Sequence, residues 1–332
     1  MRRAWLLGTT VAAALGRDPN PPAERPAAAS ATMTACEGHR APLPSALFYE
    51  LRAAAFPGSG RPDVAVHVPP GFDATRRPGV VVYFHGWENC VAAVLADRET
   101  PCSEGGVPRA GSRLAAQMDE AHVNALLVAV ELRADAATGD PGQLAVPENA
   151  RAMLRELFAE HLVEPLGCTL ELEDLDRIVL VAHSGGYQAT ANTLAHGGLP
   201  RVTQVVLLDA LYGADEVFSS WLLDPDPVPA GPRRFVDLYT CCGLPYERSH
   251  ALARVVRAAS DDGGSSAPGT AGVVVDDEPH EPEALAEASL ARALTQPVVF
   301  ALVSTPHEAI PRTYFRTTLD DAGLAPLPEP LP

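Results

Sequence analysis

The sequence predicts an α/β protein in which a mostly parallel central sheet lies between two layers of helices. From about residue 62 onward, short β-rich runs alternate with longer helical stretches, which is typical of strands joined by crossover helices. Several β-rich runs, among them residues 80–84 and 178–182, are continuously apolar and rich in β-branched side chains. A strand needs such a composition when helices cover both faces of its sheet. These observations predict a three-layer sandwich.

The expected strands and helices follow one another in a regular order. We expect strands at residues 63–68, 79–84, 125–131, 177–182, 203–208, 234–239 and 297–303. We expect helices at residues 111–122, 148–166, 186–196, 215–222 and 247–259. The apolar side chains of the second helix fall on one stripe at a period of 3.6 residues: Met153, Leu154, Leu157, Phe158 and Leu162. In such sheets ligands bind beyond the carboxyl ends of the strands, so functional residues are expected there.

The two ends of the chain lack this pattern. Residues 1–16 combine a short basic start, Arg2 and Arg3, with an apolar run, a layout typical of a secretory signal peptide. Residues 17–40 form a Pro/Ala-rich spacer, and residues 324–332 form a Pro-rich tail. We expect one domain at residues 41–323, with an acidic, solvated insertion at about 260–283. The protein is therefore expected to be exported, to the periplasm or the extracellular space, with a lipid anchor at Cys36 as a minor alternative.

Composition narrows the classes of partner and cofactor. Of 332 residues, 47% are hydrophobic and 20% are charged, an ordinary balance for a globular protein. The formal net charge is −17, the same sign as nucleic acid, so no nucleic-acid partner is expected. The body of the chain has no apolar run of bilayer-spanning length, so no integral membrane segment is expected after signal removal. All 25 basic residues are arginine, which excludes cofactor and phosphate chemistry that depends on lysine.

Six cysteines, an even number, accompany the export signal and predict disulfides. Cys90 and Cys102 form the best local pair because turn-prone sequence separates them. For the adjacent Cys241 and Cys242 we expect separate partners, or one buried thiol. The spacings do not match a zinc site, and no metal is expected.

A serine follows one expected central strand where the chain turns into a helix. Residues 182–187 (AHSGGY) place Ser184 in a sharp turn, where Ala182 and Gly186 must be small to avoid a clash. The start of the helix also favours negative charge that develops near the serine. This segment resembles the nucleophile elbow, G-x-S-x-G, of the α/β-hydrolase superfamily, with Ala182 at the first glycine position. The resemblance covers roughly residues 63–322 without the insertion, and it implies an α/β-hydrolase fold with Ser184 as nucleophile.

The same resemblance implies an oxyanion hole. Residues 84–87 (FHGW) end the strand at 79–84, where hydrolases of this fold carry an HG dipeptide. Carried over to this chain, the two backbone N–H donors belong to Trp87 and Gly185. For the side chain of His85 we expect only a structural role, as a hydrogen-bonding partner of the loop backbone.

The resemblance also implies that the catalytic acid follows Ser184 along the chain and that the base follows the acid. His307 follows the last expected strand, where the family places its general base, and an imidazole titrates near working pH. Asp209 follows the strand after the elbow helix and is the favoured acid. Asp237 and Glu247 remain alternatives, although Asp237 lies inside an expected strand and would be buried away from the histidine.

Together these residues predict an exported serine hydrolase that cleaves an ester bond, with an amide bond as the alternative, through an acyl-enzyme. Ser184 would attack, His307 would act as base and then acid, and Asp209 would orient His307. The substrate would be a small-molecule or polymer ester, and no cofactor is expected. The alternative is a catalytically inactive protein of the same fold that acts as an extracellular binding protein. A redox protein that uses Cys241 and Cys242 is a third hypothesis.

Overall fold

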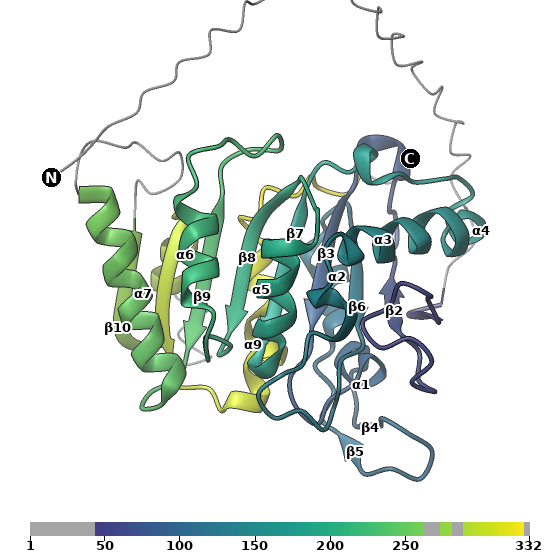
Figure 1. Cartoon of the computed structure of the whole chain (residues 1–332), viewed down its shortest axis with the longest axis horizontal. Helices are drawn as coiled ribbons and strands as arrows, with labels where there is room; N and C mark the ends of the chain where they lie inside the picture. Colours follow the sequence, from purple (N-terminus) through teal and green to yellow (C-terminus); the bar gives the residue numbers. More distant parts are fainter. Residues whose placement is uncertain (1–43, 262–272, 281–287, 329–332) are drawn as a thin grey trace, which may run out of the picture. The chain divides into compact units, whose positions relative to one another are not determined.

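The structure is a computed structural model, and it describes residues 44–261, 273–280 and 288–328 (Figure 1). These residues belong to one compact unit, Thr34–Pro332. The expected signal peptide, the spacer and Cys36 lie outside the described residues.

Within the described residues, nine strands form one sheet in the order β1-β2-β6-β3-β7-β8-β9-β11-β10. Strand β2 is antiparallel to both of its neighbours, and every other neighbouring pair is parallel. The strands are β1 (Leu47–Tyr49), β2 (Val64–His67), β3 (Gly79–Phe84), β6 (Ala125–Val130), β7 (Ile178–His183), β8 (Val202–Leu208), β9 (Arg234–Tyr239), β10 (Val273–His280) and β11 (Val298–Val303). A separate short hairpin pairs β4 (Thr100–Pro101) with β5 (Pro108–Arg109).

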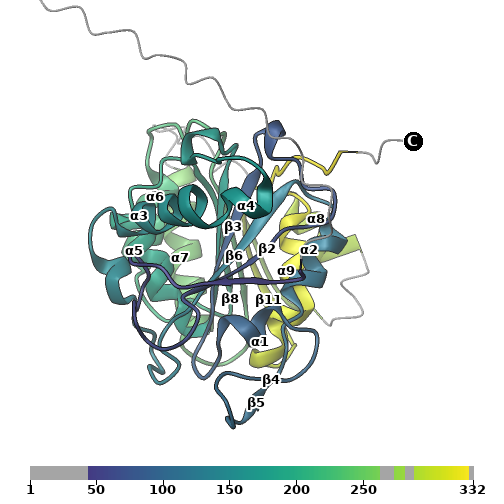
Figure 2. The ribbon, with the colours of Figure 1, turned by 90° about the vertical axis from the view of Figure 1, so that its right-hand side faces the viewer.

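Helices cover both faces of this sheet, so the predicted three-layer α/β sandwich is confirmed (Figure 2). One face packs against α3 (Asn149–Glu156), α5 (Tyr187–His196), α6 (Asp215–Leu223) and α7 (Leu244–Asp261). The other face packs against α1 (Val91–Leu95), α2 (Leu114–Ala121), α8 (Ala288–Leu294) and α9 (Ile310–Leu319). Alternate residues of each central strand enter opposite cores: Val80 and Val82 lie in one, Val81 and Tyr83 in the other. Burial on both faces is the physical reason for the continuous apolar runs.

All seven expected strands are present, but the helices differ in detail. The helix expected at 148–166 is divided into α3, a π-helical turn at Leu157–His161, and α4 (Val163–Leu166). Helices α1, α8 and α9 were not expected from the sequence. Among the described residues, no helix combines the length and the apolar composition that crossing a membrane requires.

Two segments that were expected to lie outside the sheet, the acidic insertion and the Pro-rich tail, contact it. Within the segment expected as a solvated insertion, β10 (Val273–His280) pairs in parallel with β11 at the edge of the sheet. In the expected Pro-rich tail, the carbonyl of Ala325 accepts the Asn124 N–H at 2.7 Å, and the Leu327 N–H donates to the His122 carbonyl at 2.9 Å. The described part of the tail therefore lies beside the start of β6.

The expected disulfide between Cys90 and Cys102 is confirmed, and it joins the start of α1 to the β4–β5 hairpin. The expectation for the other local pair is wrong, because Cys241 is bonded to Cys242. The two residues lie one residue beyond the end of β9, and both are exposed.

Candidate active site

Ser184 lies in a strained turn between β7 and α5. Its φ angle is +52°, in the left-handed region that non-glycine residues seldom occupy. A 3-10 turn, Ser184–Gly186, leads from the strand into the helix. A Cβ on Gly186 would lie 2.3 Å from the Phe84 carbonyl oxygen, so β3 approaches the turn too closely for any side chain there. The turn thus has the geometry that the sequence predicts for a nucleophile elbow.

The loop after β3 lies against the same serine. A Cβ on Gly86 would lie 2.7 Å from the Cβ of Ser184, which brings the backbone of Trp87 close to the turn. Trp87 and Gly185, the oxyanion donors that the family resemblance implies, therefore both lie in segments that adjoin Ser184.

His85 holds this loop in place. Its Nδ1–H donates to the Gly86 carbonyl at 2.8 Å, and its Nε2 accepts the Leu132 N–H at 2.9 Å. Complete burial lowers the pKa of His85 more than the nearby Glu131 raises it, so the ring is neutral. The side chain is structural, as predicted.

Asp209 and His307 form a close pair at the carboxyl ends of β8 and β11. His307 Nδ1 lies 2.6 Å from Asp209 Oδ2, and the Asp209 side chain is 2% exposed. Thr240, at the end of the intervening strand β9, donates its N–H to Oδ1 at 2.8 Å and its hydroxyl to Oδ2 at 2.9 Å. Burial raises the pKa of Asp209, but the hydrogen bonds from His307 and Thr240 outweigh it and leave the pKa below its usual value. The carboxylate therefore stays ionised beside the imidazole.

The alternative acids lie elsewhere. Asp237 is fully buried within β9, where its Oδ2 accepts the Ser249 hydroxyl at 2.5 Å. Glu247 is in α7 and lines a different cavity, together with Asp215 and Arg248. Of the three candidate carboxylates, the structure brings only Asp209 to His307.

His183, one residue before Ser184, anchors the loop that carries His307. Its Nε2–H donates to the His307 carbonyl at 3.0 Å, and the two rings lie 4.7 Å apart. Desolvation, together with the neighbouring His307, lowers the pKa of His183 to about 3. His183 is therefore neutral, and its hydrogen bond to the His307 carbonyl holds the loop of His307 against the turn.

Two polar residues of this site, Thr240 and Tyr212, were not among the catalytic groups predicted from the sequence. The ring of Tyr212 lies edge-on to the ring of His307, with centroids 6.3 Å apart. The signal that could have found them is topological, because both follow strands whose carboxyl ends lie at the same edge as Ser184.

A cleft of about 1090 Å³ lies beside this site. Trp87, which is 52% exposed, lines it, and so does Cys102 of the β4–β5 hairpin. Three arginine–carboxylate pairs also line it: Arg61–Glu131, Arg109–Glu88 and Arg133–Asp135. The cleft therefore combines one exposed aromatic side chain with a strongly polar wall.

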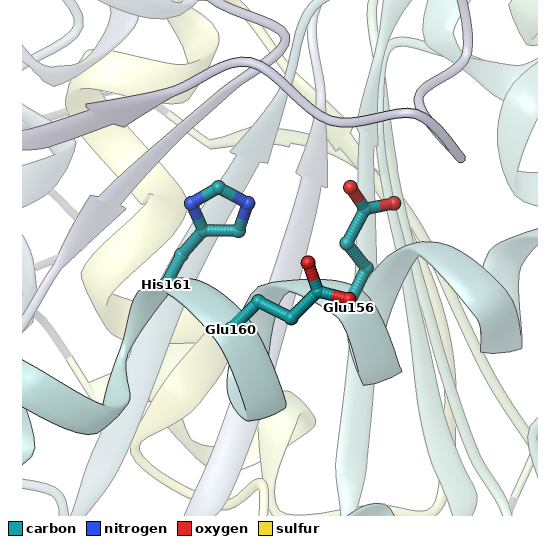
Figure 3. A group of neighbouring side chains, drawn as sticks. All are labelled: Glu156, Glu160 and His161. Atoms are coloured by element: carbon teal, nitrogen blue, oxygen red, sulfur yellow. The ribbon is translucent and has the colours of Figure 1, made fainter.

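A cluster of three possible metal ligands lies outside this site, on the helix that includes the π-helical turn (Figure 3). The ligand atoms of Glu156, Glu160 and His161 lie within 4.8 Å of one another. The Glu156 carboxylate accepts the N–H groups of Arg52 and Ala53, both at 2.9 Å, and Glu160 pairs with the Arg52 guanidinium at 2.5 Å. The Arg52 guanidinium pairs with both carboxylates and offsets part of their charge, so the cluster ties the segment of Arg52 and Ala53 to the helix.

No protein-family model and no curated protein matches the sequence. Three solved structures to which the chain is similar are a feruloyl esterase module from Clostridium thermocellum, a hormone-sensitive lipase from a metagenome library and an esterase from Thermogutta terrifontis. Identity is 10% to the first, with 78% of this chain and 82% of that chain covered and a TM-score of 0.45. Identity to the lipase is 14%, with 85% of this chain and 84% of that chain covered and a TM-score of 0.38. Identity to the esterase is 12%, with 65% of this chain and 80% of that chain covered and a TM-score of 0.39.

The fold follows from the chain's own geometry. A mostly parallel sheet lies between two helical layers, a serine occupies a strained turn from a central strand into a helix, and the paired acid and histidine follow later strands in that order. This combination of sheet, elbow and chain order is the α/β-hydrolase fold, which this protein adopts.

Proposed function

We propose that the protein is a serine hydrolase that cleaves carboxylic esters through Ser184, His307 and Asp209. The observation that carries this proposal is the 2.6 Å contact between His307 Nδ1 and Asp209 Oδ2, in a loop that His183, the neighbour of Ser184, contacts at 3.0 Å. A buried, ionised carboxylate on Nδ1 fixes the tautomer in which Nε2 can accept a proton. The imidazole is then prepared to act as general base.

In the proposed reaction, His307 Nε2 takes the hydroxyl proton as Ser184 Oγ attacks the ester carbonyl. The N–H groups of Trp87 and Gly185 donate hydrogen bonds to the oxyanion of the tetrahedral intermediate. His307 then gives its proton to the departing alcohol, and the acyl-enzyme remains. Water attacks this ester with the same histidine as base, which releases the acid and restores Ser184. The chemistry is complete with the residues of this chain.

The cleft beside Trp87 suits a large or polar ester. Its volume of about 1090 Å³ exceeds the range of about 300–1,000 Å³ that is typical of small-molecule sites. The ion pairs on its wall offer both donors and acceptors to polar groups of a substrate. Hydrolysis of an ester rather than an amide is proposed on the resemblance to α/β-hydrolases.

The test is turnover of p-nitrophenyl esters by wild type and by two carboxylate variants. Asp209→Asn should lower kcat by about 10⁴-fold, because the amide cannot hold the required tautomer of His307. Glu247→Gln is the matched control and should retain activity. Equal activity of the two variants would contradict the assignment of Asp209, and a wild type without turnover would refute the proposal.

We also propose that the chain is exported and that residues 1–16 are removed. The Cys90–Cys102 disulfide supports this, because such bonds persist in oxidising compartments. Sequencing the N-terminus of the protein recovered from a secreting host tests it, and an intact Met1 would contradict it.

A further inference from the structure

The loop between β3 and α1 carries Trp87, whose N–H is one of the two proposed oxyanion donors. A Cβ on Gly86 would lie 2.7 Å from the Cβ of Ser184, so the loop runs directly beside the proposed nucleophile. Glu88, the residue after Trp87, has a φ angle of +57°, in the left-handed region that is unfavourable for a residue with a side chain. The loop therefore needs bonds to other parts of the chain to hold this conformation.

The segment that follows β6 supplies such bonds. Strand β6 pairs in parallel with β3, so the segments that leave the two strands begin side by side (Figure 1). His85 Nε2 accepts the Leu132 N–H at 2.9 Å. The Glu88 N–H donates to the Ala134 carbonyl, also at 2.9 Å. These two bonds hold the first half of the loop, on either side of Trp87.

Glu131, the first residue beyond β6, holds the far end of the loop. Its Oε2 accepts the N–H of Val91, the first residue of α1, at 2.8 Å. Its Oε1 pairs with Arg61 at 3.2 Å. Because Glu131 and Val91 are both buried, loss of this acceptor would leave the Val91 N–H unsatisfied. The disulfide at the same end joins Cys90 only to the β4–β5 hairpin, which is separate from the main sheet.

We propose that Glu131 is a positioning residue: by accepting the Val91 N–H, it holds the loop so that the Trp87 N–H points to the oxyanion of the tetrahedral intermediate. The inference rests on the proposed ester hydrolysis. Glu131 acts through the loop and neither gives nor takes a proton. An oxyanion donor stabilises charge that develops in the transition state, so its displacement lowers kcat more than it changes KM. Glu131 also lines the cleft, and a direct contact with the substrate would instead change KM.

Two conservative variants separate the hydrogen bond to Val91 from the ion pair with Arg61. Glu131→Asp keeps the negative charge, but its carboxylate is one methylene group too short for the Val91 N–H. Glu131→Gln loses the charge but keeps an oxygen that can accept this N–H. With a p-nitrophenyl ester as substrate, we expect kcat of Glu131→Asp to fall by about 10- to 100-fold, less than the outright loss of an oxyanion donor, with KM near that of wild type. Glu131→Gln should recover most of this loss.

Inhibition by a trifluoromethyl ketone reports on the oxyanion donors themselves. Ser184 Oγ adds to the ketone carbon, the hydroxyl proton passes to His307, and the ketone oxygen becomes an oxyanion. The inhibition constant should rise in Glu131→Asp by about the factor by which kcat falls. End-point titration with a fluorophosphonate counts the active sites, so a partly misfolded variant is compared with wild type per site.

Glu156→Asp is the matched control. Glu156 is also a buried carboxylate that accepts backbone N–H groups, those of Arg52 and Ala53, and pairs with an arginine, but it lies on α3 and holds a segment outside the active site. Its kcat should stay near that of wild type.

Four results would overturn the inference and leave the proposed function intact: unchanged kcat in Glu131→Asp, a change in KM alone, no recovery in Glu131→Gln, or an equal loss in Glu156→Asp. If wild-type protein neither turns over nor labels, the proposed function fails, and this inference fails with it.

Discussion

Individual carboxylates in this protein differ sharply in protonation because their partners differ. Asp209 accepts hydrogen bonds from His307 and from both donors of Thr240, and these keep its pKa low despite burial. Asp237, one strand away, has the Ser249 hydroxyl as the partner of Oδ2, while its Oδ1 is buried without a hydrogen bond. Desolvation raises the pKa of Asp237 to about 8. The first carboxylate is suited to orient a histidine, and the second is suited to stay neutral inside the core.

This difference predicts a pH dependence of stability. Asp237 retains its proton in the folded protein up to about pH 8, whereas the unfolded chain releases it near pH 4. The folded state binds more protons between these values, so this group's contribution to the free energy of unfolding decreases as pH rises from about 4 to 8. The slope is at most about 1.4 kcal/mol per pH unit.

Urea unfolding of Asp237→Asn at several pH values between 5 and 8 checks this. In this variant the free energy of unfolding should fall less steeply with pH than in wild type, because the amide does not titrate. Asp135→Asn, at an exposed carboxylate, is the control and should follow wild type. Identical slopes for wild type and Asp237→Asn would contradict the assignment.

Among the helices and strands, the sequence predicted best the strands that helices cover on both faces of the sheet. The central strands β3 and β7 were evident from β-branched runs, because no other element requires such a composition. Strands β1, β4 and β5 are two or three residues long and carry no periodic signal. Strand β10 was missed because acidic residues follow its short apolar run. The break at Leu157–His161 was also missed, because Leu157, Phe158 and Leu162 continue the apolar spacing of an unbroken α-helix.

The elbow gives a prediction at this scale. Gly186→Ala would place a methyl group 2.3 Å from the Phe84 carbonyl oxygen, and backbone must move to relieve the clash. We expect the free energy of unfolding to fall by about 1–3 kcal/mol and labelling of Ser184 to slow. Gly243→Ala is the control, because the nearest atom to its added methyl group is 3.9 Å away. Thermal unfolding and labelling rates measure both effects, and a fully stable, fully reactive Gly186→Ala would show that β3 does not constrain the turn.

For the whole molecule, the sheet is what brings distant residues together. Trp87, Ser184, Asp209 and His307 follow β3, β7, β8 and β11, whose carboxyl ends meet at one edge. The sequence and the family resemblance could therefore name these residues, because each follows a recognisable strand. Thr240 and Tyr212 could not be assigned roles, because their contacts with Asp209 and His307 depend on the exact path of the loops after the strands end.

The central claim is that Ser184 is an activated nucleophile, and covalent labelling by a fluorophosphonate followed by peptide mass spectrometry tests it most directly. We expect one label per chain, on Ser184, that is absent in Ser184→Ala and strongly slowed in His307→Ala. Folded wild-type protein that takes up no label, or takes it up on another residue, would contradict the account and favour a binding protein on a hydrolase fold.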